Sequence, residues 1–298
     1  MKFIKDNLSS SIIVLTFLAL AVPELFSQEI QYVMALVGIF SFGILHGSND
    51  LFVIENLSSN SKQNQFVKSL SIYLGVVLTF VAIFYFIPFI ALLAFVLISG
   101  YHFGEQHFHH KISNQKSILA SLFYLSYGLL VLFLLLYFNS SEVIAIIEDM
   151  TSYLVPEKVL FYVLLFSMLG SLILYLILSK NNKALRASAL HNLFYFILFS
   201  GLFYVSDVVW GFAVYFVLWH SLPSLKDQVN SLYGTFDLKN FYKYFKKAFP
   251  YWLASIIGMC VVVWIFKDSK NFLSLLFAFI AAITFPHVFV MRKLFDRD

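Results

Sequence analysis

Long apolar runs separated by short polar stretches dominate the chain. Ten of these runs approach the roughly 20 residues that an α-helix needs to cross a bilayer. They lie at residues 9–26, 30–47, 66–87, 88–108, 117–138, 157–178, 185–205, 207–224, 248–267 and 271–291. We therefore predict an all-α, polytopic transmembrane helical bundle that forms a single domain over residues 1–298. Pro88 is predicted to open a helix directly after a tight turn.

Composition supports this interpretation. Hydrophobic residues make up 60% of the chain and charged residues 12%, against about 25% charged in ordinary soluble domains. So little charge excludes a disordered chain and a soluble enzyme of normal composition. The single cysteine, Cys260, lies in an apolar run, where we expect a small buried hydrophobic residue.

The basic residues predict the orientation, because Lys and Arg collect on the cytoplasmic side of membrane proteins. With the N-terminus placed inside, 17 of the 20 basic residues fall in inner segments, and only Lys158, Lys267 and Lys270 fall outside. The split predicts an even number of spans with both termini in the cytoplasm. Eight spans would satisfy the same parity as ten. Scattered basic residues, and no leader of the transit type, predict a multi-pass protein of a bacterial inner membrane without a nucleic-acid partner.

The longest polar stretch is 226–247. Its lysines alternate with aromatic residues, a pattern typical of a basic amphipathic helix lying on the inner leaflet. We predict a connector on the cytoplasmic side here, and a plain solvated connector is the alternative.

Eight histidines carry the candidate chemistry, because ionisable residues within spans are rare and usually functional. Five of them, in five different spans, map to the cytoplasmic third of the predicted bilayer: His46, His102, His191, His220 and His287. His107 lies near the same surface, whereas His109 and His110 are expected to be exposed there. Neutral imidazole suits Fe, Zn, Cu and Ni, and side chains converging from several helices can build a metal site. A lone histidine that hydrogen-bonds another helix is the alternative for each residue.

Two carboxylates accompany these histidines. Asp50 follows His46 by four residues and can accept its second ring N–H, or cap the next helix. Glu105 follows His102 by three residues and shares its helix face.

Four short motifs follow one another along the chain: HG-x-x-D at His46, HFG at His102, HS at His220, and T-x-P-H at His287. In this order they resemble the bacterial and archaeal Brp/Blh family of integral membrane β-carotene 15,15'-dioxygenases, over about residues 35–290. The resemblance implies an Fe(II)-dependent oxygenase that cleaves the central double bond of β-carotene with O₂ and releases two all-trans retinal molecules. It also implies that His46, His102, His220 and His287 form the iron site, and that a microbial rhodopsin receives the retinal.

The chain departs from the family pattern at two positions. Ser224 stands where family members often have a second histidine, and His107 stands where they often have an aspartate. One ligand is therefore absent, or His107, His191 or His287 completes the set.

β-Carotene dissolves in the bilayer, so its enzyme needs an apolar tunnel. Phe196, Phe216 and Trp219 are the candidates for its wall, with ordinary packing against protein or lipid as the alternative. Other classes also fit a His-rich membrane protein. A desaturase or hydroxylase needs several close-spaced histidine boxes, and this chain has only H-x-H-H at 107–110. A metal or haem transporter is expected to show repeats or midplane broken helices, which we do not find in the sequence.

Overall fold

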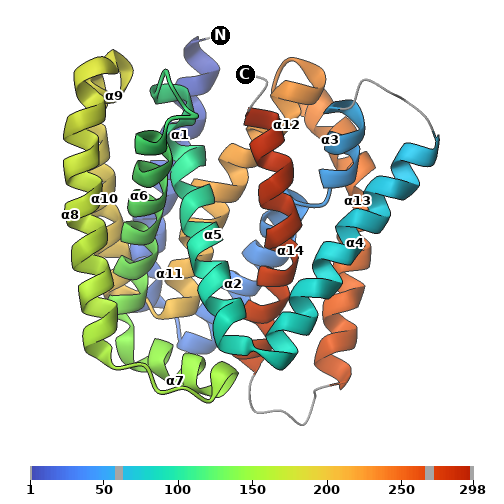
Figure 1. Cartoon of the computed structure of the whole chain (residues 1–298), viewed down its shortest axis with the longest axis horizontal. Coiled ribbons are helices and arrows are strands. Elements are labelled where there is room, and N and C mark those ends of the chain that lie inside the picture. The colour runs from blue at the N-terminus through green and yellow to red at the C-terminus, as the bar shows by residue number, and fades with distance from the viewer. Residues whose placement is uncertain (1, 58–62, 266–271, 296–298) are drawn as a thin grey trace.

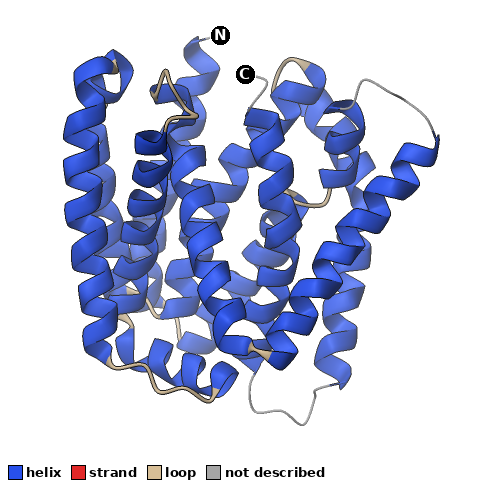
Figure 2. Ribbon diagram, in the orientation of Figure 1, coloured by secondary structure: helices blue, strands red, loops and turns tan. Residues whose placement is uncertain are grey.

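The computed structural model describes residues 2–57, 63–265 and 272–295, which are helical apart from short connections and contain no strand (Figure 2). The helices are α1 (Lys2–Leu25), α2 (Gln28–Gly38), the π-helix η1 (Ile39–Gly43), α3 (Asp50–Leu57), α4 (Gln63–Phe86), α5 (Pro88–Phe108), the 3-10 helix η2 (His109–Lys111), α6 (Ile118–Phe138), α7 (Ser140–Thr151), α8 (Glu157–Asn181), α9 (Lys183–Ala187), α10 (Ala189–Val205), α11 (Val208–Val214), the π-helix η3 (Tyr215–Ser221), α12 (Leu222–Tyr233), α13 (Leu238–Ile265) and α14 (Phe272–Phe295). The predicted helical membrane bundle is confirmed.

The described residues form eight helical segments that are long and apolar enough to span a membrane. α10 is apolar but only 17 residues long. The second predicted span, 30–47, covers most of α2, η1 and the beginning of the turn before α3. Eight is the smaller of the two even numbers that the basic residues allow, and the start of α1 and the end of α14 lie at the same end of the bundle (Figure 1). Which end faces the cytoplasm stays a prediction; Lys62, Lys267, Lys270 and Arg297 lie outside the described residues.

Local sequence explains several helix ends. α4 stops at Phe86 and α5 starts at Pro88, as predicted, because proline's fixed φ suits the first helical turn. The Asp207 side chain accepts a hydrogen bond from Trp210 N at 2.7 Å and so caps α11.

Glycines allow α5 and α6 to pack in backbone contact. A Cβ at Gly104 would lie 1.9 Å from the carbonyl oxygen of Tyr124, and a Cβ at Gly128 would lie 1.7 Å from that of Gly100. Gly100 and Gly104 flank His102 on α5, so this close packing sets the position of the His102 backbone.

The segment 226–247 is not the single helix that we predicted. α12 ends at Tyr233 and α13 starts at Leu238, so the segment contains a turn between two spanning helices. Lys239, Lys243, Lys246 and Lys247 are exposed, but Tyr244 on the same helix is fully buried. The amphipathic pattern is therefore real, and its apolar face packs into the bundle. Cys260, expected to be buried, is exposed on α13.

Candidate metal centre

Four histidines from four separate segments form a closed ring of imidazoles inside the bundle. His46 lies in the turn between η1 and α3, His102 on α5, His220 in η3, and His287 on α14. All four are nearly inaccessible, with exposed fractions of 4%, 0%, 2% and 2%. Ring centroids are 5.0 Å apart for His46–His220, 4.9 Å for His220–His102, 5.5 Å for His102–His287 and 4.7 Å for His287–His46.

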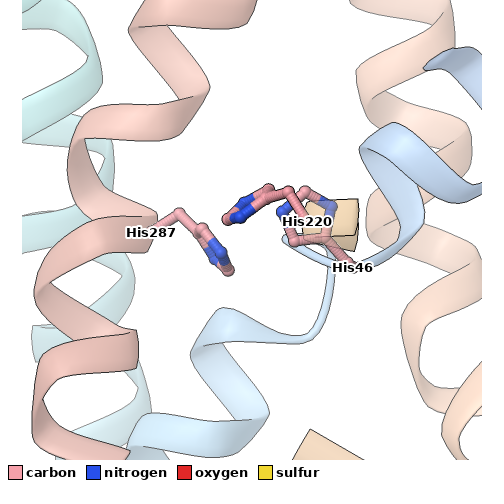
Figure 3. A group of neighbouring side chains, drawn as sticks. All are labelled: His46, His220 and His287. Atoms are coloured by element: carbon pink, nitrogen blue, oxygen red, sulfur yellow. The ribbon is translucent and has the colours of Figure 1, made fainter. Parts of the chain in front are cut away.

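Three of these side chains already have the spacing of a metal site. His46, His220 and His287 each offer a ring nitrogen, and these nitrogens lie within 4.8 Å of one another. Figure 3 shows their rings converging on one space from α14, η3 and the turn after η1. A search of the described residues for three or more His, Cys, Asp or Glu side chains with this spacing finds this group. His102 joins the ring through its contacts with His220 and His287.

The ring nitrogens lack ordinary partners. Both nitrogens of His46 and His102, Nδ1 of His220 and Nε2 of His287 make no hydrogen bond of normal geometry to any described residue. A buried polar atom without a partner costs about 1–3 kcal/mol. One ring nitrogen each of His46, His220 and His287 lies within 4.8 Å of the others, and a metal ion that accepts a lone pair from each would satisfy these buried groups. The residues present therefore fit a metal held by neutral imidazoles.

Asp50 orients His287. Its Oδ1 lies 2.8 Å from Nδ1 of His287, and its Oδ2 accepts a hydrogen bond from the Tyr73 hydroxyl at 3.1 Å. A carboxylate on Nδ1 selects the tautomer whose Nε2 carries the free lone pair, which is a common support for metal-binding histidines. The prediction that Asp50 serves His46 is wrong: the turn at 46–49 separates the two residues and directs the carboxylate to α14.

The backbone breaks beside two of the histidines. η1 precedes His46 and η3 contains His220, and such π-helical segments are frequent at functional sites because they re-aim side chains. A broken helix in a membrane needs its freed carbonyl groups satisfied from within the protein. The His46 carbonyl accepts hydrogen bonds from Gln228 Nε2 at 2.7 Å and the Tyr244 hydroxyl at 3.1 Å. The His220 carbonyl accepts one from Gln106 Nε2 at 3.0 Å.

Sequence reasoning missed Gln106, Gln228 and Tyr244, together with Tyr73. Gln228 follows His220 by eight residues and Ser224 by four, so helical spacing placed it on the same face. Tyr244 gave no such signal, because the lysines around it are typical of a surface helix, and only the structure shows that the Tyr244 side chain is buried.

The lower-ranked candidates occupy different places. Ser224 is buried one turn after His220, where its hydroxyl accepts a hydrogen bond from Gln228 Nε2 at 3.3 Å. Glu105 is buried and accepts one from the Tyr101 hydroxyl at 3.0 Å. His107 packs against Tyr127 and Tyr195, with ring centroids 5.2 and 5.8 Å away. His191 is exposed at the start of α10, so the structure does not bring it into the ring.

His109 and His110 were both expected to be exposed at the surface. His110 is exposed, but His109 is buried and stacks on Phe295.

His220 lies farther from the end of its helical segment than predicted. His220 lies twelve residues after the start of α11 and thirteen before the end of α12, which is about 18–20 Å from either end. The predicted span ended at residue 224, but the chain continues as helix to Tyr233. His220 therefore lies near the middle of the helical segment Val208–Tyr233.

Of the three aromatic candidates, only Phe216 reaches the site. Its ring stacks on His220 at 5.5 Å and lines a cavity of about 30 Å³ beside His46 and His287. Trp219 packs on Tyr195 and donates a hydrogen bond to Thr16 Oγ1 at 2.9 Å, and Phe196 joins the core nearby. Neither lines a described cavity.

A sequence profile of the family described as β-carotene 15,15'-dioxygenase matches residues 37–295. The chain belongs to the β-carotene 15,15'-dioxygenase family. The match begins just before η1 and includes all four ring histidines, Asp50, Gln228 and Tyr244, which agrees with the resemblance found in the four sequence motifs. Comparison with curated protein sequences and with solved structures gave no match.

Proposed function

We propose that this chain is an iron-dependent oxygenase that cleaves the central 15,15' double bond of β-carotene with O₂ and yields two molecules of all-trans retinal. The observation that carries the proposal is the ring of four buried histidines in a helical membrane bundle of this family. The reaction balances without another reductant, because each carbon of the broken double bond gains one oxygen atom of O₂.

His46, His102, His220 and His287 would hold the iron, and His287 would do so through Nε2. Bound iron supplies the oxygen chemistry, which side chains cannot provide. Asp50 and Tyr73 keep the His287 ring in one orientation, and the Gln228–Tyr244 pair holds the turn that carries His46. No proton transfer by a side chain is required, so we assign no general acid or base.

The surroundings of the ring suit a hydrocarbon substrate. The cavity beside His46 and His287 is otherwise lined by Ile39, Ile44, Phe216, Phe279, Ile280 and Ile283, together with Gly43, Gly47 and Thr284. Such a lining favours an apolar molecule and excludes water from the site. We also propose that the chain resides in a bacterial inner membrane, where substrate arrives from the lipid and retinal passes to a microbial rhodopsin.

The test is expression of the chain in a bacterium engineered to accumulate β-carotene, with pigment extraction and chromatography. Loss of β-carotene with formation of retinal supports the proposal, whereas unchanged β-carotene, with the protein present in the membrane and iron supplied, contradicts it. Formation of apocarotenals of other lengths would support an oxygenase but would show that it cleaves a different double bond. Elemental analysis of the purified protein distinguishes iron from zinc, copper or nickel, and a two-iron content would indicate a desaturase-like centre.

A further inference from the structure

A second, larger cavity lies close to the histidine ring. It has a volume of about 110 Å³, and its surface is entirely apolar. It is lined by residues of α5, α6, α7, α11 and α14. A hydrocarbon offers no hydrogen-bonding group, so only the shape of such a cavity can fix where the hydrocarbon stops.

The near end of this cavity touches the ring. Phe103, one of its lining residues, lies with its ring centroid 4.6 Å from that of His220. Phe212, another lining residue, stacks on Phe216 at 5.1 Å, and Phe216 stacks in turn on His220. The cavity therefore starts within one side chain of His220 and His102.

The two cavities lie on different sides of the imidazoles. The first contacts His46 and His287, whereas the second adjoins His220 and His102, the other half of the ring. The stacked pair of Phe212 and Phe216 separates them, since Phe216 lines the first cavity and Phe212 the second.

The far end of the second cavity is closed by α7, which lies across the end of the bundle opposite to the termini (Figure 1). Val143, Ile147 and Met150 project into the cavity from one face of this helix, with spacings of four and three residues. On α5 the lining runs from Phe103 back to Leu92, about 16 Å of helix. The cavity is thus elongated from the ring towards α7.

α7 is held in place by polar contacts at both ends. Glu142 accepts hydrogen bonds from Val208 N at 3.3 Å and from the Tyr32 hydroxyl at 3.4 Å. Asp149 accepts one from the Ser274 hydroxyl on α14. Because α7 is fixed to α2, α11 and α14, it can limit how far a bound molecule extends into the cavity.

We propose that one end of the carotenoid lies in the cavity that ends at α7, and that α7 sets which double bond lies at the histidines. This inference rests on the proposed function. Central cleavage then follows because the end group stops against Val143, Ile147 and Met150. Shortening this cavity displaces the polyene away from α7. The double bond that then lies at the histidines is one closer to the end group in the cavity.

The test compares Ile147→Trp, which fills the far end, with Ile173→Trp on α8, where the native side chain is 56% exposed. Wild type and the control are expected to yield retinal alone. Ile147→Trp is expected to yield two unequal apocarotenals whose carbon atoms sum to those of β-carotene. Retinal as the sole product of Ile147→Trp, at whatever rate, overturns the inference and leaves the proposed function intact. Absence of any product from wild type overturns the proposed function itself.

If Ile147→Trp does not fold or forms no product, Met150→Phe shortens the cavity less and is judged by the same criterion. A second measurement needs no turnover. In a Cys260→Ser background, maleimide labels the thiol introduced by Ile147→Cys in metal-free protein, with and without β-carotene. We expect β-carotene to slow this labelling several-fold and to leave the labelling of an Ile173→Cys control unchanged. Equal labelling of Ile147→Cys with and without β-carotene contradicts occupation of the cavity.

Discussion

Nδ1 of His287 lies 2.8 Å from Oδ1 of Asp50, although 237 positions separate the two residues. Asp50 therefore belongs to the site through α14 and not through its sequence neighbour His46. Because the carboxylate sets the tautomer and basicity of this imidazole, the pair predicts how the site binds metal.

Asp50→Asn is expected to lower metal affinity about 10- to 100-fold, since outer partners of ligating histidines typically contribute this much. Tyr73→Phe, which removes only the hydrogen bond to Asp50 Oδ2, is expected to have a smaller effect. Competition with a chelator in detergent solution measures both affinities. Wild-type affinity in a folded Asp50→Asn protein would show that Asp50 does not act on a metal ligand.

Ser224 tests whether the four-histidine ring is complete. Its hydroxyl is occupied by Gln228, and the ring closes without it. Ser224→Ala is expected to keep its bound metal and retinal formation within about twofold of wild type, whereas His287→Ala is expected to lose both. Metal content by elemental analysis and product by chromatography give the result. Loss of metal in Ser224→Ala would place this position among the ligands.

The α5–α6 contact predicts a sharp difference between glycines. Gly104→Ala places a Cβ against the Tyr124 carbonyl and is expected to destabilise the protein by about 1–3 kcal/mol or more, because neither backbone can easily retreat. Gly201→Ala is the matched control, since nothing lies within 4 Å of its added Cβ, and is expected to be neutral or stabilising. Thermal unfolding in detergent measures the difference. Equal unfolding temperatures would mean that the helices are less closely packed than described.

Two carboxyl groups near α7 predict a pH dependence of stability. Burial raises the pKa of Glu142 above its ordinary value, and the charge of Asp207 adds to this; burial also raises the pKa of Asp207. The folded state then holds protons that the unfolded state has released, so these groups favour folding less as pH rises through their raised pKa values. Glu142→Gln removes one of these titrating groups. Relative to wild type, it is expected to raise the unfolding temperature more near pH 7 than at pH 4–5. If Glu142→Gln left the pH dependence of the unfolding temperature unchanged, the raised pKa of Glu142 would be contradicted.

The distribution of basic residues predicts that the end of the bundle carrying both termini faces the cytoplasm. A fluorescent protein fused to the C-terminus is expected to fluoresce, and alkaline phosphatase fused there is expected to be inactive. Fusions after Ser152, in the connection from α7 to α8, are the reciprocal control and should give the opposite result. An active phosphatase at the C-terminus would invert the topology.

The sequence by itself determined the class of fold, most spans and a group of five intramembrane histidines, from which the family resemblance selected the four of the ring. Apolar runs report burial in lipid directly, and histidines are rare enough in such runs to be conspicuous. Pro88 marked its helix start equally well, because proline acts locally through its fixed φ.

Only the tertiary structure decided how the site is held. Asp50 was assigned to the wrong histidine, because a break at residues 46–49 cancels the helical spacing on which that assignment relied. The segment that contains Tyr244 was read as interfacial, and the helix that carries His220 was predicted to end too early, because polar residues that satisfy a buried broken helix resemble residues at a membrane surface. The partners of buried polar groups come from distant parts of the chain, and a periodic pattern along one segment does not encode which distant segment supplies them.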